Sequence, residues 1–353
     1  MKAIILVGGQ GSRMRPLTDH LPKNIVPLCG IPFLTYQIEY LKKAGIKDIV
    51  FSLCYRPQDI KKVYGDGRKL KVKIHYALEK EPLGTAGAIK NSEKYVKGSP
   101  VVILNGDILT DIPLKKMISF HKKQKNAATL GLFRVEDPTA YGLVLLDAKS
   151  RITKFLEKPK AEEAVTDTIN AGVYIFEPEV FNFIPAGVNY SAERGLFPGL
   201  LDAKAAFGGF VWKGYWQDIG TPRKYLTTHW DVLDGTFPVF AALRKNAGRI
   251  YMGKGVKIGK GAVIKGPAIL EDGCVIGAGA KILAYSVLGK KCVIGAKSSI
   301  SKSVLWDGVQ VGEKVDLDEV VLGRKCDIPN DSIVPAGTVW GDKNTIHEPE
   351  IKK

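Results

Sequence analysis

Over residues 1–232, short apolar runs alternate with segments whose apolar residues recur at helical spacing. The runs predict buried strands over Lys2–Val7, Asp48–Leu53, Val72–Ala77 and Val101–Leu104. Helices are predicted between and after them, over Phe33–Ala44, 57–64, 84–96, 113–124 and Tyr225–Leu233. This alternation is typical of an α/β fold, here a Rossmann-like, mostly parallel sheet with helices on both faces.

Polar clusters directly follow two of the predicted strands, at Gly8–Arg15 and at Asn105–Asp107. Ligands of parallel α/β sheets bind at the carboxyl ends of the strands. Both clusters are therefore candidate parts of a functional site.

A different pattern occupies residues 250–340, where apolar residues recur at every sixth position. A second row of mostly small residues lies two positions earlier in each repeat. A period of six fits neither a helix nor a hairpin, and it predicts a parallel β-helix with three-sided coils of about 18 residues. We expect the period to slip near Val309–Val311, Trp306 to belong to the apolar core row, and Cys274 and Cys292 to stack as packed thiols. The regular apolar row is Ile258, Ile264, Leu270, Ile276, Ile282, Leu288, Ile294, Ile300 and Trp306.

These two patterns predict the domain organisation. An α/β domain is expected over 1–232, a linker over 233–249, the β-helix over 250–340 and a tail over 341–353. A chain of 353 residues is long enough for two such domains.

Composition narrows the class of protein. The 45% apolar and 25% charged content is that of an ordinary globular chain, and the net charge of +16 attracts anionic partners or reflects a Lys-rich surface. Five cysteines without a CxxC pair argue against a disulfide framework and against zinc.

No apolar run has the length of a membrane span, and the first residues predict a strand rather than a signal peptide. We expect a soluble, cytoplasmic protein without membrane partners.

The stretch Gly8–Thr18, with sequence GGQGSRMRPLT, carries the clearest chemistry. Glycines after a strand let backbone N–H groups approach phosphate, and Arg13 adds charge-assisted hydrogen bonds. The stretch lacks the P-loop pattern, and Met14 stands where a dinucleotide-binding fingerprint has its last glycine. Lys23 adds a second cation a few residues later.

GGQGSRMRPLT followed by PKNIVPL resembles the signature of the sugar-phosphate nucleotidyltransferases, and within that family the mannose-1-phosphate guanylyltransferase branch. The resemblance extends over residues 1 to 232, and a left-handed β-helix of hexapeptide repeats is a known appendage of the family. Other segments match in order: Glu81–Gly87, Asn105–Asp107, Phe155–Pro159, Asn170–Tyr174 and Trp216–Pro222.

The resemblance implies an enzyme that joins a nucleoside triphosphate to a sugar 1-phosphate and releases pyrophosphate. Arg13, Lys23 and Asp107 are the implied catalytic residues, and Asp107 and Asp218 would hold Mg²⁺, a cation that prefers carboxylate and phosphate oxygens. The residues implied to bind the nucleotide are Leu6, Gly8, Gly9, Gly11, Ser12, Arg13, Glu81, Gly84 and Thr85. Those implied to bind the sugar phosphate are Gly142, Glu157, Lys158 and Asn170.

Glu81 favours guanine as the base. One carboxylate can accept from both N1–H and N2–H₂ of guanine, whereas uracil and thymine match an amide better. Mannose follows from the resemblance alone, and glucose 1-phosphate or a heptose 1-phosphate stay open as substrates.

The predicted β-helix contains none of the five histidines, so a second, acyl-transfer activity is not expected there. We expect it to mediate homo-oligomer assembly. Alternatives to a guanylyltransferase are a glucose-1-phosphate uridylyl- or thymidylyltransferase, a non-catalytic regulatory subunit, and a translation-factor-like scaffold. The chain has no RNA-binding motif, so nucleic acid is not an expected partner.

Overall fold

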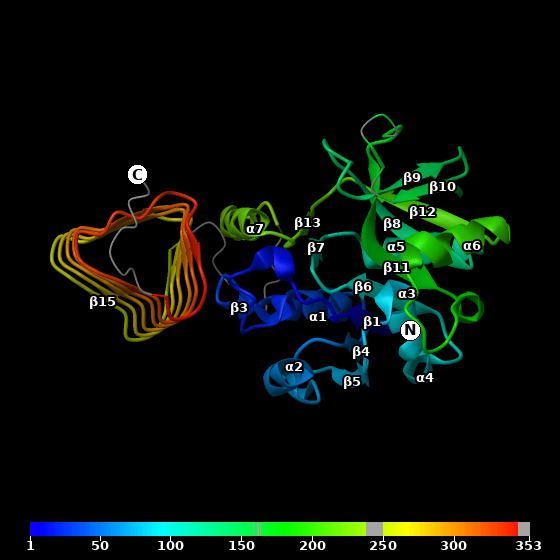
Figure 1. The fold of residues 1–353 in the computed structure, drawn as a ribbon, viewed down its shortest axis with the longest axis horizontal. Helices are drawn as coiled ribbons and strands as arrows, with labels where there is room; N and C mark the ends of the chain where they lie inside the picture. Colours follow the sequence, from blue (N-terminus) through cyan, green and yellow to red (C-terminus); the bar gives the residue numbers. More distant parts are fainter. Residues whose placement is uncertain (158, 161, 163, 238–249, 345–353) are drawn as a thin grey trace. The chain divides into compact units, whose positions relative to one another are not determined.

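The computed structural model describes residues 1–157, 159–160, 162, 164–237 and 250–344. The chain forms two compact units (Figure 1). The first comprises Met1–Gly9 and Gln37–Trp216, and the second comprises Gln10–Tyr36 and Gln217–Lys353. Helix α1 (Phe33–Lys43) and strand β13 (Trp216–Asp218) each run from one unit into the other. No helix among the described residues is long and apolar enough to cross a membrane.

A nine-stranded sheet forms the first unit. Its main path runs β10-β9-β11-β6-β1-β4-β5, and β8 joins β11 to β12. β1 pairs in parallel with β4 and β6, and β4 pairs in parallel with β5. The strands are β1 (Lys2–Leu6), β4 (Asp48–Leu53), β5 (Lys73–Leu78), β6 (Val101–Asn105), β8 (Ala128–Arg134), β9 (Gly142–Leu146), β10 (Ile152–Glu157), β11 (Thr168–Phe176) and β12 (Phe207–Trp212). The predicted fold class is confirmed. The four strands predicted from apolar runs, β1, β4, β5 and β6, pair in parallel with one another, and β8 and β12 form a further parallel pair.

β11 introduces antiparallel pairing, with β6 on one edge and with β8 and β9 on the other. The helical segments agree closely with the predicted ranges, except that 84–96 divides at Ser92 into two helices. The helices are α2 (Pro57–Tyr64), α3 (Gly84–Asn91), α4 (Glu93–Val96), α5 (Leu114–Lys123) and α6 (Phe197–Asp202).

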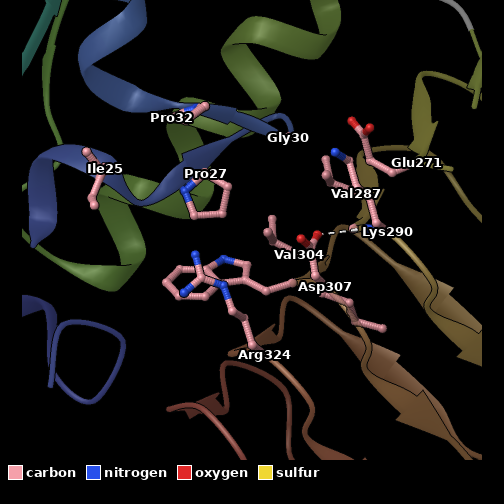
Figure 2. A pocket seen from close by; sticks show the side chains of 13 residues that line it. Ile25, Pro27, Gly30, Pro32, Glu271, Val287, Lys290, Val304, Asp307 and Arg324 are labelled. Atoms are coloured by element: carbon pink, nitrogen blue, oxygen red, sulfur yellow. Dashed lines mark hydrogen bonds between the residues drawn. The ribbon is translucent and has the colours of Figure 1, made fainter. Parts of the chain in front are cut away.

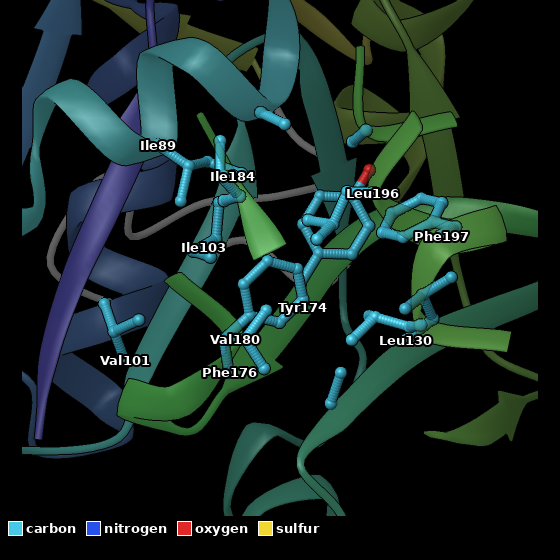
Figure 3. Packing of buried hydrophobic residues seen from close by; sticks show 14 of the residues in the cluster. Ile89, Val101, Ile103, Leu130, Tyr174, Phe176, Val180, Ile184, Leu196 and Phe197 are labelled. Atoms are coloured by element: carbon cyan, nitrogen blue, oxygen red, sulfur yellow. The ribbon is translucent and has the colours of Figure 1, made fainter. Parts of the chain in front are cut away.

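Apolar side chains from the sheet and its helices pack into one core in this unit (Figure 3). Val101 and Ile103 of β6 and Tyr174 and Phe176 of β11 are fully buried in it, and Phe197 of α6 packs against Tyr174 with ring centroids 5.7 Å apart. This burial fixes the two strands whose polar ends carry candidate site residues.

The second unit begins with short elements and ends in the β-helix. Two 3-10 helices, η1 (Ser12–Met14) and η2 (Lys23–Ile25), precede the small antiparallel pair β2 (Pro27–Leu28) and β3 (Ile31–Pro32). Helix α7 (Pro222–Asp234) follows β13, and the side chain of Thr221 caps its first turn by accepting from the backbone N–H of Lys224 at 3.3 Å.

Three parallel sheets form the β-helix. In Figure 1 the coils of residues 250–344 are seen nearly end-on as a triangle. The first sheet contains β14 (Ile250–Met252), β17 (Ala268–Leu270), β20 (Ser286–Leu288), β23 (Val304–Leu305), β26 (Val321–Leu322) and β28 (Val339–Trp340). The second contains β15 (Lys257–Ile258), β18 (Val275–Ile276), β21 (Val293–Ile294), β24 (Gln310–Val311) and β27 (Asp327–Ile328). The third contains β16 (Val263–Ile264), β19 (Lys281–Ile282), β22 (Ser299–Ser301) and β25 (Asp316–Asp318).

The period slips earlier than the sequence predicted. Ile282 pairs with Ile300, whereas the next core position, Leu288, pairs with Leu305. The corner at Lys302 is therefore one residue shorter than its counterpart in the previous coil. Leu305, and not Trp306, occupies the apolar core row.

The prediction that Trp306 belongs to that row was wrong for this reason, although its side chain is 2% exposed. The interior cluster of the β-helix contains Leu305 and not Trp306. The Trp306 indole instead donates to the hydroxyl of Tyr225 at 3.0 Å.

The row of small residues behaves as predicted. Cys274 and Cys292 are free, buried thiols on one face of the interior, and each donates to a backbone carbonyl at 3.1 Å. The division at residues 232–233 and the linker stay predictions, and most of 233–249 and of the tail lies outside the described residues.

Candidate functional site

In the first unit, three neighbouring parallel strands end next to one another with polar or glycine residues. Gly8 lies just beyond β1, Cys54 follows β4 directly, and Glu79 follows β5 directly. A Cβ atom added at Gly8 would lie 3.5 Å from Cβ of Cys54 and 3.6 Å from Oε1 of Glu79. Gly9, by contrast, faces open space. Gly8 and the Glu79 carboxylate are therefore close neighbours at these strand ends.

Glu79 is a residue that sequence reasoning missed. Its Oε1 accepts from the Ser52 hydroxyl at 3.0 Å, and its Oε2 accepts from the backbone N–H of Leu83 at 3.1 Å. These bonds hold the carboxylate in one orientation, while the predicted Glu81 is exposed. The position of Glu79 directly after an apolar run was the available signal. Burial and the Glu79 charge raise the pKa of the neighbouring Cys54 thiol, which therefore stays protonated at neutral pH.

The ends of β1 and β6 lie side by side. Leu6 pairs with Asn105, and the backbone N–H of Gly106 donates to the Leu6 carbonyl at 2.9 Å. The side-chain amide of Gln37 donates to the carbonyls of Asn105 and Ile108 at 2.7 and 2.8 Å. This clamp fixes the backbone on both sides of Asp107.

An irregularity in β11 brings Asn170 toward the end of β6. The pairing with β8 shifts register between Asn170 and Tyr174. The Asn170 amide donates to the Tyr174 hydroxyl at 3.0 Å, and its Oδ1 accepts from the backbone N–H of Gly172. A Cβ at Gly172 would lie 2.7 Å from Nδ2 of Asn105, so this glycine allows β6 and β11 to approach. Burial raises the pKa of Tyr174, which stays a neutral hydrogen-bonding group.

Gly142 and Glu157 form a second pair of predicted site residues in this unit. They are directly opposite in the β9–β10 ladder, and a Cβ at Gly142 would lie 3.0 Å from Oε2 of Glu157. Lys158, the remaining predicted sugar-phosphate residue, lies outside the described residues.

Gly84 and Thr85 begin helix α3, and both contact the segment 189–193. A Cβ at Gly84 would lie 2.9 Å from the Tyr190 carbonyl, and the Thr85 hydroxyl is 3.4 Å from Oε2 of Glu193. The Tyr190 carbonyl also accepts from the backbone N–H groups of Ala86 and Gly87. The start of α3 is therefore anchored by protein contacts.

In the second unit, the glycine-rich stretch folds back on Lys23. Gly11 has a φ of +67° at the start of η1, and a Cβ there would lie 3.0 Å from Cβ of Lys23. The Thr18 hydroxyl donates to the Gly11 carbonyl at 2.8 Å. Met14 is buried and anchors η1, whereas Ser12 and Arg13 are exposed.

Arg13 and Asp218 meet around one glycine. A Cβ at Gly220 would lie 2.5 Å from Oδ2 of Asp218 and 3.2 Å from Nη2 of Arg13. Asp218 is buried, accepts from the Gly220 backbone N–H at 3.2 Å, and pairs with the ammonium of Lys224. This unit therefore places a guanidinium and a buried carboxylate around one point, although the two residues are far apart in sequence.

The donor chemistry of Asp107 and Asp218 fits a hard divalent cation such as Mg²⁺. Within the described part of the chain, no cluster of three or more His, Cys, Asp or Glu side chains forms a complete metal cage.

The first unit contributes strand-end glycines and a fixed carboxylate, and the second unit contributes the cations Arg13 and Lys23; these features are typical of nucleotide-binding α/β proteins. The family profile described as nucleotidyl transferase matches residues 2–235, and that of the EIF2B subunit epsilon LbH domain matches residues 247–351. The chain therefore belongs to the nucleotidyl transferase family, and it is a sugar-phosphate nucleotidyltransferase with a left-handed β-helix.

Named relatives agree with this assignment. The chain is 38% identical over 272 residues to "Mannose-1-phosphate guanylyltransferase" from Mycobacterium tuberculosis, covering 77% of this chain and 75% of that protein. HddC from Yersinia pseudotuberculosis is a similar solved structure, with a TM-score of 0.57 and 31% identity over 65% of this chain and 97% of that chain. HddC complexed with GMP-PN matches with a TM-score of 0.56 and 30% identity over the same shares.

Proposed function

We propose that this enzyme makes GDP-mannose and pyrophosphate from GTP and mannose 1-phosphate. The observation that carries the guanine assignment is the Glu79 carboxylate, fixed beside Gly8 at the strand ends. The similarity to a mannose-1-phosphate guanylyltransferase and to a protein solved with GMP-PN supports the same choice.

The proposed reaction is an in-line displacement. A phosphate oxygen of the sugar 1-phosphate attacks the α-phosphorus, and pyrophosphate leaves. Catalysis then depends on positioning the substrates and neutralising charge. Arg13 would contact the departing pyrophosphate, and Lys23 would neutralise the phosphates from the other side of Gly11. Asp107 and Asp218 would hold Mg²⁺, which lowers the charge repulsion between the reacting phosphates when bound.

The nucleotide would lie along the strand-end glycines. Gly8, Gly9, Gly11 and the segment at Ser12 allow close approach of backbone N–H groups to phosphate. Leu6, Gly84 and Thr85 would line the nucleoside part, as the family resemblance implies.

Glu79 would accept from N1–H and N2–H₂ of guanine. Glu81 stays a second candidate for this role, from sequence reasoning. Uracil and thymine present an acceptor that a carboxylate repels, so either residue would disfavour UTP and dTTP.

The sugar phosphate would bind near strands β9, β10 and β11. Asn170 and Glu157 would contact sugar hydroxyls, Gly142 would leave room for the ring, and Lys158 would contact the phosphate. Mannose is proposed from the named relatives, and no described contact distinguishes it from glucose.

The proposed assembly is a homo-oligomer formed through the β-helix, in the cytoplasm. Support comes from the first coil, where Ile258 is 47% exposed while its counterpart in the next coil, Ile276, is 1% exposed. A second copy of the chain would cover this apolar side chain.

Pyrophosphate release with Mg²⁺, measured over a grid of nucleotides and sugars, tests this proposal. The grid contains GTP, UTP, dTTP, CTP and ATP against mannose, glucose and N-acetylglucosamine 1-phosphates. We expect the highest kcat/KM with GTP and mannose 1-phosphate. Turnover only with UTP or dTTP and glucose 1-phosphate would favour the uridylyl- or thymidylyltransferase alternative. No turnover by folded protein would favour the regulatory-subunit alternative.

A further inference from the structure

A cavity of about 230 Å³ lies wholly inside the second unit (Figure 2). The β2–β3 segment forms one wall, with Pro27 and Pro32 facing the cavity. The β-helix forms the opposite wall. The charged residues of that wall are Glu271, Lys290, Asp307 and Arg324.

Three of these charges stand at equivalent positions of successive coils. Val287 pairs with Val304, and Val304 pairs with Val321, so Lys290, Asp307 and Arg324 are stacked in register. Oδ1 of Asp307 accepts from the backbone N–H of Lys290 at 2.9 Å. This bond orients Asp307 without using the Lys290 ammonium.

The floor of the cavity is apolar. Trp306 is buried there, and the Arg324 guanidinium lies over its ring at 5.7 Å from the centroid. Val287 and Val304 extend this surface on the β-helix side, opposite the two prolines. A carbon skeleton fits between these walls, with charged groups around it.

The mixture of charges selects the kind of ligand. Lys290 and Arg324 provide cations for an anionic group, and carboxylates of Asp307 and Glu271 accept hydrogen bonds from hydroxyls. A zwitterion would meet the same local charges, but the net charge of +16 favours a ligand that is anionic overall. These requirements together describe a small phosphorylated polyol, such as a sugar phosphate.

The cavity is connected to proposed catalytic residues by short paths within the second unit. Ile25, which lines it, belongs to η2 together with Lys23. Trp306 donates to the Tyr225 hydroxyl, and that hydroxyl donates to the carbonyl of Pro27. Tyr225 follows Lys224, the ion-pair partner of Asp218.

We propose that this cavity is an effector site for a sugar phosphate, separate from the substrate site. A bound ligand bridges Arg324 and Lys290 to the β2–β3 segment and thereby fixes the positions of η2 and α7. Binding of the sugar phosphate to this cavity does not depend on the proposed function. The effect of that binding on the rate of the guanylyltransferase reaction rests on the proposed function.

Isothermal titration with glucose 6-phosphate tests the site in the full chain, with inorganic phosphate and glucose as comparison ligands. Wild type is expected to bind glucose 6-phosphate more tightly than either comparison ligand. Arg324→Gln and Lys290→Gln should each raise the Kd at least ten-fold. Lys325→Gln removes a neighbouring exposed charge that does not line the cavity and should change the Kd less than two-fold.

Three results would overturn the site: no binding, equal Kd values in all variants, or binding lost in Arg13→Ala but kept in Arg324→Gln. Inorganic phosphate that binds as tightly as the sugar phosphate would overturn the polyol assignment.

Saturating glucose 6-phosphate should also change kcat/KM for GTP at least two-fold in wild type and Lys325→Gln, but not in Arg324→Gln. Binding without this change would overturn the effector role. If no nucleotide is turned over at all, the proposed function fails while the titration still decides whether the site exists.

Discussion

The sheet of the first unit and the β-helix of the second unit place charged residues by different means. In the sheet, Glu79 and Asp107 follow buried strands, so the core that fixes the strands also fixes the site. In the β-helix, Lys290, Asp307 and Arg324 acquire their spacing from the repeat itself, one coil after another. The end of one strand positions a single charged side chain, whereas the repeat positions a row of charged side chains on successive coils.

The comparison also separates two sources of stability. The sheet has a core that its helices help to cover, while the β-helix interior is covered coil by coil. A residue of the first coil has a neighbour on one side among the described residues, so the same side chain contributes differently in different coils.

Arg13→Ala should lower kcat/KM about 1,000-fold, because one charge-stabilising group toward the departing pyrophosphate is lost. The melting temperature should stay unchanged, since Arg13 is exposed. Steady-state kinetics measures the effect.

Arg15→Ala is the matched control, because Arg15 lies in the same loop, is exposed and pairs with Asp19 at 3.3 Å. We expect less than a three-fold change in kcat/KM for it. Equal losses in both variants would contradict a specific role for Arg13.

Ile276→Ala should lower the free energy of unfolding by about 3 kcal/mol, because it leaves a cavity inside the β-helix. Ile258→Ala, at the paired position one coil earlier, should cost less than about 1 kcal/mol in the monomer, since Ile258 is 47% exposed and Ile276 is 1% exposed in a single chain. Urea denaturation at a concentration that keeps the chain monomeric measures both. Equal losses in the monomer would contradict this difference in burial.

Acid should destabilise the protein through His229, which is buried in α7. Burial lowers the pKa of its imidazole to about 4, whereas an unfolded histidine titrates near 6.5. Between these pH values the unfolded state binds the additional proton, so stability falls as the pH decreases from about 6.5 to about 4, by about 3 kcal/mol in total.

His229→Gln should reduce this slope when unfolding free energy is measured against pH. His121 of the first unit, whose pKa burial also lowers, stays in the variant and keeps part of the slope. An unchanged slope would show that His229 is already charged in the folded protein.

Glu79→Gln should reduce the preference for GTP over dTTP about ten-fold, because an amide cannot accept from both guanine donors. Glu81→Gln is the matched control, from the same acidic segment but exposed. Competition assays with the two nucleotides measure the ratio. A larger effect of the control variant would return the role to Glu81.

Sequence patterns predicted much of this fold because burial imposes periodicity. The six-residue period predicted the β-helix, and the apolar runs predicted the four parallel strands β1, β4, β5 and β6. The shortened corner at Lys302 escaped prediction, since Leu305 and Trp306 are both apolar and only the pairing register tells them apart. The antiparallel strands around β11 were not predicted either, because their residues carry no signal of pairing direction.

The site was harder to predict, because its geometry depends on contacts between residues distant in sequence. Spacing could not show that Arg13 and Asp218 share the space around Gly220, or that Ser52 and Leu83 hold Glu79. Family resemblance supplied the proposed roles of Lys23 and Glu157. The structure shows which residues lie beside them, Gly11 for Lys23 and Gly142 for Glu157.

Competition between nucleotides for one sugar 1-phosphate tests the proposed function. The purified protein is incubated with Mg²⁺, mannose 1-phosphate and equal concentrations of GTP, UTP, dTTP, CTP and ATP, and the nucleotide sugars formed are identified by mass spectrometry. We predict that GDP-mannose forms first and is the main product. A uridine or thymidine product, or none from folded protein, would contradict it.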